Sequence, residues 1–246
     1  MFKDYLEKSR SPWYSFIFAF PALVIYELGL FWMRNIEFKY IQNSADFLIE
    51  KIINNSSFEV LHISSIIFFV VLIAILAYQK KKFRSVQVNI KYLNFMIVES
   101  LIYASILFFI MGNIYLMDVS SNDLLSNIIL SFGAGIYEEL IFRVLLIYLF
   151  AKLVKFLFRL GNSSSELYAI FFSAILFSLF HFIQIESFNL YSLIGFVSDN
   201  KDAFALRFIA GIFLGILYLK RGFGITAITH SIYDIFVIFS SFKLLT

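Results

Sequence analysis

The sequence contains no cysteine and only two prolines, and charged residues make up 15% of its 246 positions. The absence of cysteine excludes disulfides and thiol catalysis, and it indicates little about the cellular compartment. A soluble domain carries about 25% charged residues, so the low charge argues against a soluble fold. Histidine is also scarce. Any imidazole chemistry must use His62, His181 or His230.

Apolar residues take the place of the missing charges. They make up 61% of the chain, and 33 residues are phenylalanine. Apolar runs of about 20 residues are long enough to cross a bilayer as helices. The sequence therefore predicts an all-α, polytopic transmembrane helix bundle of about seven to eight spans. The seven expected spans are 13–33, 58–78, 93–117, 127–150, 167–185, 203–219 and 223–242, and an eighth crossing could lie in 34–57 or 187–202.

The basic residues predict the orientation in the membrane. The strongest cluster, at 80–84, follows the second span, and Lys152, Lys155 and Arg159 follow the fourth. A cytoplasmic N-terminus puts both groups on the cytoplasmic side, in agreement with the positive-inside rule. We therefore expect a multi-pass integral membrane protein with a cytoplasmic N-terminus and no cleavable signal peptide. We assign the 80–84 cluster to topology and to contact with anionic membrane lipids, not to nucleic-acid binding.

The segment 135–143, GIYEELIFR, places Glu138, Glu139 and Arg143 inside an apolar run. A charged side chain near the bilayer centre costs about 3 kcal/mol or more, so this group of three needs a reason. Glu139 and Arg143 are four residues apart on one helical face, where a carboxylate–guanidinium pair neutralises both charges. Glu138 is rotated from Glu139 by about 100° and is left without a local partner.

An unpaired carboxyl group inside the membrane can take and give protons, which suits Glu138 to acid–base catalysis. The alternative is that all three charged residues only hold helices together. We favour a functional role, because ionisable residues within membrane spans are functional by default.

Two of the three histidines follow this motif on separate spans. Phe177 lies four residues before His181, so its ring can pack beside the imidazole, and His230 lies four residues before Asp234. Each position alone is a weak signal, because a lone histidine in an apolar helix usually only packs. Together with Glu138, these groups occupy three spans, and we expect them to converge on one polar cavity well within the spans.

Such a cavity suits the activation of water. A carboxylate and one imidazole can deprotonate a water while a second imidazole stabilises the oxyanion that forms at a carbonyl. Zinc is the alternative cofactor. His181, His230 and Asp234 offer two imidazoles and a carboxylate, which is a known ligand set of hydrolytic zinc sites. The residues alone leave both mechanisms open.

The three motifs together resemble the CPBP (CAAX protease and bacteriocin-processing) family of intramembrane proteases, which includes the type II CAAX prenyl endopeptidases. The resemblance covers about 127–239. It implies a catalytic transmembrane core at 121–246, preceded by N-terminal transmembrane helices at 1–120. The motifs, in chain order, are Glu138-Glu139-x-x-x-Arg143, Phe177-x-x-x-His181 and His230-x-x-x-Asp234.

The resemblance also implies roles for these residues. In the family, the first glutamate and the histidine of the second motif activate water, and here these are Glu138 and His181. The last histidine and its partner, here His230 and Asp234, are assigned to the oxyanion side, and the second glutamate and the arginine are supporting residues. The family often has Asn at the last position, whereas an ionised aspartate cannot donate a hydrogen bond. Asp234 can therefore be a neutral donor, an orienting group for His230 or a metal ligand.

These observations predict an intramembrane endopeptidase that hydrolyses a peptide bond of a membrane-anchored or lipidated substrate. Membrane lipids are the other expected partners. The alternative is a non-catalytic CPBP-like immunity or scaffold protein, or a small transporter that uses the same groups as a proton relay. The complete set of motif residues favours the peptidase, because a degenerate relative would be expected to lose Glu138 or a histidine.

Small residues indicate where helices approach closely. Gly133 and Gly135 should let a neighbouring helix approach the Glu-Glu motif. The pattern Gly211-x-x-x-Gly215 should serve the same purpose in the sixth span.

Two further acidic residues and one polar segment have open roles. Glu27 and Glu99 lie within the first and third spans, where they could line a substrate path, pair with Arg207 or bond to neighbouring polar groups. The segment 45–53 could form a short amphipathic helix at the membrane interface.

Overall fold

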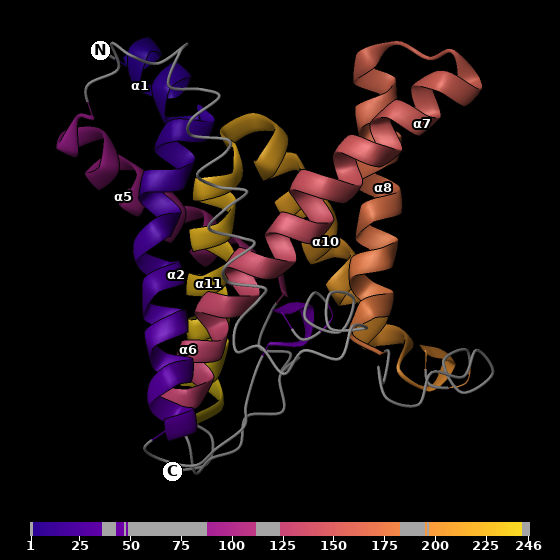
Figure 1. Cartoon of the computed structure of the whole chain (residues 1–246). Coiled ribbons are helices and arrows are strands. Elements are labelled where there is room, and N and C mark those ends of the chain that lie inside the picture. The colour runs from indigo at the N-terminus through magenta and orange to yellow at the C-terminus, as the bar shows by residue number, and fades with distance from the viewer. Residues whose placement is uncertain are drawn as a thin grey trace, which may run out of the picture.

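The structure is a computed structural model that describes residues 2–35, 43–46, 48, 88–111, 124–182, 195 and 197–242. Every regular element in these residues is a helix, which confirms the all-α prediction (Figure 1). The second expected span, 58–78, with His62, and the basic cluster at 80–84 lie outside the described residues.

The described helices begin with α1 (Phe2–Ser9), α2 (Pro12–Asn35), α5 (Ile90–Met111) and α6 (Leu124–Gly133). Two π-helical segments follow, η1 (Ala134–Glu138) and η2 (Leu140–Ile147). The last four are α7 (Tyr148–Phe158), α8 (Asn162–Phe180), α10 (Lys201–Arg221) and α11 (Phe223–Phe242).

Five of these helices are long and apolar enough to cross a membrane, namely α2, α5, α8, α10 and α11. Large apolar side chains cover their outer faces. Phe109, for example, is 82% exposed. Such surfaces are typical of a membrane-embedded bundle. The total of seven to eight spans, and the division of the chain at residue 120, stay predictions.

The bounds of α2, α10 and α11 agree with the expected spans to within two residues, but those of α8 do not. α11 has the predicted bounds, whereas α8 begins and ends five residues before the expected 167–185. The cause lies at its first turn, where Gly161 has an extended backbone and the helix begins at Asn162. Small polar residues are favoured at helix N-termini, and the hydroxyl of Ser165 donates to the carbonyl of Gly161 at 2.9 Å.

The Glu-Glu motif lies in one continuous helical run that crosses the bundle obliquely, from Leu124 to Phe158 (Figure 1). Its middle consists of the π-helical segments η1 and η2. π-Helical turns are rare and occur frequently at functional sites, because they leave backbone groups without regular helical partners. Here the hydroxyl of Ser173 on α8 donates to the carbonyl of Phe142 at 2.5 Å.

The oblique helix packs between the two helices that carry the histidine motifs. η1 contacts α11, and η2 contacts α8. α11 also packs against α2, α5, α6 and α10, and Figure 1 shows α2 and α11 side by side. The chain therefore brings all three motifs together through direct helix contacts.

Glycines permit these close contacts, as their positions predict. A methyl group at Gly135 would overlap Ser231 Oγ and the carbonyl oxygen of Ala227 on α11. At Gly211, on α10, an added Cβ would lie 3.0 Å from Ala174 of α8. η1 and α11 approach so closely that only glycine fits at position 135, and the contact between α8 and α10 at Gly211 is tight.

Glu27 and Glu99 have polar partners and line no part of the cavity described below. Glu27 Oε1 accepts a hydrogen bond of 2.6 Å from the Tyr137 hydroxyl. Glu99 pairs with Arg221, whose Nη2 donates to Glu99 Oε2 at 2.8 Å and to Ser9 Oγ at 2.7 Å. Glu99 is therefore part of a structural ion pair that joins α1, α5 and α10.

Replacing Gly135 with alanine should destabilise the fold, because the added methyl would force η1 away from α11. Overpacking of this kind costs about 1–3 kcal/mol. We expect a lower unfolding temperature in detergent and reduced activity. Gly161→Ala is the control, since nothing lies within 4 Å of its added Cβ. Equal unfolding temperatures for the two variants would contradict the close packing.

Candidate active site

One cavity of about 250 Å³ collects the predicted chemical groups. It lies between the oblique helix, α8, α10 and α11. The predicted site residues that line it are Glu138, Phe177, His181, His230 and Asp234. Glu139 and Arg143 are not among the lining residues, so the two glutamates of the motif occupy different surroundings. The convergence expected from the sequence is thus present.

Glu138 presents its two carboxylate oxygens to different neighbours. The side chain is 5% exposed. Oε1 accepts a hydrogen bond of 3.1 Å from Asn43 Nδ2. Oε2 lies 3.7 Å from His181 Nε2 and has no hydrogen-bond partner among the described residues. This separation is too long for a direct hydrogen bond, and it is suited to a bridging water.

His181 stands at the C-terminal cap of α8, directly after Phe180. The expectation that it lies well within a span is therefore wrong for the described helix. At this position the imidazole can donate to one of the last carbonyls of the helix, which lack helical partners. Nδ1 donates to one of them, the carbonyl of Phe177, at 2.8 Å. With Nδ1 protonated for this bond, the neutral ring has a free lone pair on Nε2, which faces Glu138.

Glu139 joins the oblique helix to α11. Its Oε1 accepts a hydrogen bond of 2.8 Å from His230 Nδ1, and its Oε2 lies 3.0 Å from Arg143 Nε. All three side chains are nearly fully buried. The ion pair predicted from the i, i+4 spacing is therefore present, and it also fixes the ring of His230. Because Nδ1 of His230 is committed to Glu139, Nε2 is the atom left for the cavity.

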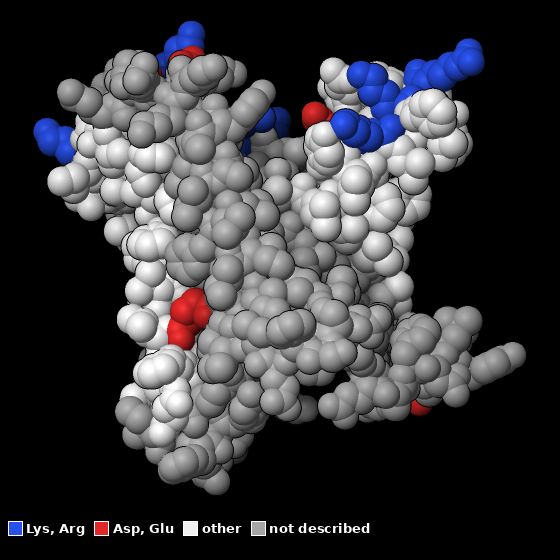
Figure 2. Space-filling model, in the orientation of Figure 1, with Lys and Arg blue, Asp and Glu red and all other residues white. Residues whose placement is uncertain are grey.

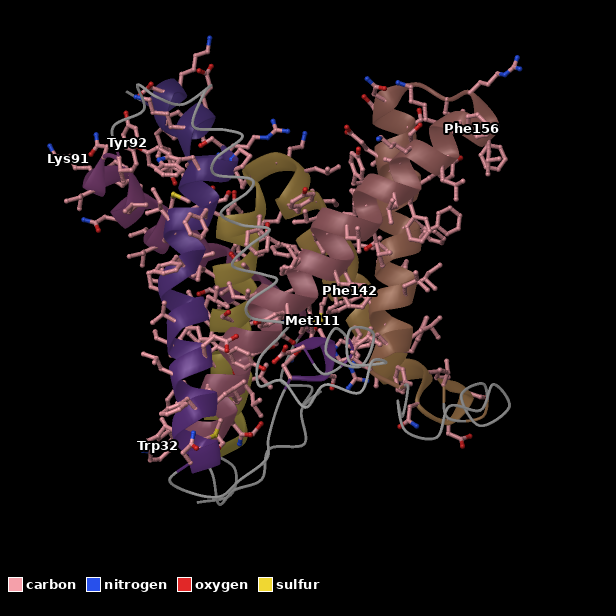
Figure 3. The ribbon with its side chains drawn as sticks, viewed as in Figure 1. Trp32, Lys91, Tyr92, Met111, Phe142 and Phe156 are labelled. Carbon is pink, nitrogen blue, oxygen red and sulfur yellow. The ribbon has the colours of Figure 1, made fainter. Side chains whose placement is uncertain are left out.

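The ring of Phe177 packs against three of the functional side chains. Its centroid lies 4.8 Å from that of His181 and 6.0 Å from that of His230. The guanidinium carbon of Arg143 lies 4.3 Å from the same ring, a cation–π distance. Phe142 on η2, labelled near the middle of the bundle in Figure 3, packs edge-on against Phe177 at 5.3 Å. Phe177 therefore contacts the Arg143 guanidinium and both imidazoles.

Asp234 lies one helical turn after His230 and also faces the cavity. Its Oδ2 is 3.6 Å from His230 Nε2, beyond hydrogen-bond distance. The two side chains therefore lie close together without a direct hydrogen bond.

Sequence reasoning missed several polar residues of the cavity, among them Asn43 and Arg207. Asn43 reaches it from the segment after α2, and Arg207 from α10. The guanidinium carbon of Arg207 lies 4.9 Å from the ring centroid of Phe182. Neither residue stands in a recognisable motif. The sequence suggests Arg207 only as a partner of Glu27 or Glu99, whereas Glu99 pairs with Arg221.

His181, His230 and Asp234 are the candidate ligands of a zinc site. In the part of the chain that the structure describes, no group of three or more His, Cys, Asp or Glu side chains is arranged to hold a metal ion. The pairs His181–Glu138 and His230–Asp234 are each present, but they do not combine into one ligand set. Zinc therefore stays an untested alternative, and no step below passes through a metal.

Residues 120–236 match the family model described as type II CAAX prenyl endopeptidase Rce1-like. This region belongs to the CPBP family. All of the motif residues that form or support the cavity lie within it. Proteins that match this family model are generally proteases. Together with the five apolar helices, the match points to an integral membrane protein. Searches of curated proteins and of solved structures found no match.

Proposed function

We propose that this CPBP-family protein is an intramembrane endopeptidase that activates water with Glu138 and His181. The observation that carries the proposal is the 3.7 Å gap between Glu138 Oε2 and His181 Nε2. A water oxygen can lie about 2.8 Å from both atoms at once. Both atoms can accept a proton from it, since the hydrogen bonds of Asn43 and Phe177 occupy the opposite sides of the two groups.

The reaction follows from this placement. The water oxygen attacks the carbonyl carbon of the scissile bond, and its proton passes to Glu138. When the C–N bond breaks, Glu138 returns the proton to the leaving nitrogen. His181 accepts a second hydrogen bond from the water, which orients a lone pair of the water oxygen toward the carbonyl carbon.

His230 is the group that we assign to the developing oxyanion. Glu139 accepts a hydrogen bond from its Nδ1–H, so the imidazole can donate from Nε2 in its doubly protonated form. The buried Glu139–Arg143 pair keeps the ring in this orientation. A donor that is fixed before the reaction stabilises the oxyanion without reorganisation.

The substrate class follows from the position of the cavity. The lining is mostly apolar, and the surrounding helices present their outer faces to lipid. A peptide that is anchored in the membrane, or that carries a lipid, is already concentrated at such a site. We therefore assign a membrane-anchored or lipidated peptide as substrate.

We also propose that the N-terminus is cytoplasmic. Figure 2 shows Lys and Arg side chains gathered at the end of the molecule that holds α1 and the α7–α8 turn. The basic residues there include Lys8, Lys152 and Lys155. A one-sided excess of basic residues is the charge pattern of a cytoplasmic face.

Glu138→Ala and His181→Ala should both abolish cleavage while the protein stays folded. The assay uses purified protein in nanodiscs with a pool of membrane-anchored peptides, and metal content is measured on the same samples. Removing a catalytic acid–base group typically costs about 10²–10⁴-fold in rate. Wild-type cleavage without stoichiometric zinc is the expected result.

Two outcomes would contradict the proposal. Cleavage that requires about one bound zinc would move the chemistry to metal-activated water. A folded wild type that cleaves no peptide in the pool would favour the immunity, scaffold or transport alternative.

Asp234→Asn should retain activity within about tenfold of wild type, because Asp234 makes no short hydrogen bond to His230 and Asn keeps its shape. Initial cleavage rates in the same assay provide the measurement. Asp234→Ala is the companion variant, since it removes the polar group altogether. If Asp234→Asn is inactive while its unfolding temperature is unchanged, Asp234 takes part in proton transfer or metal binding instead.

A further inference from the structure

We infer that Asn43 is a positioning residue for Glu138, supplied by the N-terminal part of the chain outside the family match. The inference deepens the proposed function and rests on it. Asn43 Nδ2 donates to Glu138 Oε1 at 3.1 Å, across 95 residues of sequence. Both residues line the cavity. Residues 120–236, which match the family, do not include Asn43.

The amide of Asn43 has only one orientation that satisfies its neighbours. Its Oδ1 accepts a hydrogen bond of 2.8 Å from the backbone N–H of Ala45. This is the geometry of an asparagine at a helix start, and the turn Ser44–Asp46 that follows is helical. The amide oxygen is therefore turned toward the backbone, and the Nδ2 donor must point the other way, toward Glu138.

Tyr26 of α2 holds this turn over the active site. Its hydroxyl donates to Asp46 Oδ2 at 2.9 Å and accepts from the backbone N–H of Asn43 at 3.1 Å. Tyr26, Ala45 and Asp46 are at most 2% exposed. The helix expected at 45–53 is present at its first two residues, Ala45 and Asp46, which are both buried. Its amphipathic, interfacial character stays a prediction. The remainder of that segment, apart from residue 48, lies outside the described residues.

Tyr26 also contacts the helix that carries Glu138. A methyl group at Gly133 would overlap the Tyr26 ring, so the two elements meet at a glycine immediately before η1. The Tyr26 and Tyr137 rings lie 5.5 Å apart, and Tyr137 directly precedes Glu138. Tyr26 therefore contacts both the turn that carries the donor Asn43 and the helix that carries the acceptor Glu138.

The hydrogen bond from Asn43 gives the two carboxylate oxygens of Glu138 different roles. Oε1 is occupied by Asn43, and Oε2 is free to accept the proton of the water beside His181. A neutral amide is suited to this task, because a hydrogen bond to a carboxylate is charge-assisted and adds no further charge. The charged and titratable groups near Glu138 are His181 on α8, Arg207 on α10, His230, Tyr233 and Asp234 on α11, and Glu139 and Arg143 on its own helix.

The substitution Asn43→Asp tests this inference selectively. Aspartate caps a helix as well as asparagine does, so the acceptor for Ala45 N–H is retained. Only the donor to Glu138 is lost, and two carboxylates then face each other. We expect a lower unfolding temperature than wild type. Asn35→Asp removes an amide donor at the exposed end of α2, where Asn35 Nδ2 donates to the carbonyl of Phe31 at 2.8 Å, and should lower the unfolding temperature much less.

A double variant measures the contact without any need for catalysis. Glu138→Gln supplies an amide donor that can reach the introduced aspartate, so the hydrogen bond returns with its direction reversed. The unfolding temperature of Asn43→Asp combined with Glu138→Gln should therefore exceed the value expected from adding the two single effects. Strict additivity would overturn the assignment of Asn43 as the partner of Glu138.

Cleavage kinetics test the catalytic value of the contact. Asn43→Asp should lower kcat by about 10- to 100-fold at neutral pH with little change in KM, as expected for a lost hydrogen bond to a charged group. Its rate relative to wild type should recover at acidic pH, where the introduced carboxyl group is protonated and donates again. A purely structural role predicts no such recovery.

An unchanged kcat for Asn43→Asp would overturn the positioning role. A folded wild type that cleaves no peptide would instead overturn the proposed function and with it the catalytic value of the bond. In that case the coupling of unfolding temperatures would still decide whether Asn43 holds Glu138. The two failures are therefore distinguishable.

Discussion

The buried ion pair between Glu139 and Arg143 is the interaction on which the rest of the site depends. Within a membrane, a charge without a partner is costly, so each ionised group needs another. Glu139 meets this requirement twice, with Arg143 on its own helix and with His230 on α11. The guanidinium of Arg143 also makes a cation–π contact with the ring of Phe177, and the same ring packs against His181. One pair therefore fixes the relative positions of all three motifs.

The neighbouring glutamate differs because of its direction. Glu138 points into the cavity, where Asn43 holds one oxygen and the other faces His181 across 3.7 Å. Two adjacent residues of the same type thus have different tasks, one structural and one chemical. The difference follows from helix geometry and from the close contact that Gly135 permits between η1 and α11. Membrane helices commonly use small residues for such contacts.

The sequence predicted the local and periodic parts of this arrangement. Apolar runs predicted helices, and the i, i+4 spacing predicted the Glu139–Arg143 pair, since both depend on neighbours along the chain. The spacing could not predict the π-helical turns, which depend on contacts such as that between Ser173 and Phe142. Asn43 could not be found either, because its partner lies 95 residues away and no periodicity links them. The predicted depth of His181 was wrong because its ring caps the end of α8.

The central claim is that Glu138 acts in the chemistry and that Glu139 holds the site together. The most direct test compares Glu138→Gln with Glu139→Gln, two substitutions that change one atom at adjacent positions. Cleavage rate and unfolding temperature would be measured on the same preparations. We predict that Glu138→Gln loses cleavage but keeps an unfolding temperature close to wild type, and that Glu139→Gln loses much of its stability, because Arg143 remains buried without its carboxylate. Full activity in Glu138→Gln, or an equally stable Glu139→Gln, would contradict the account.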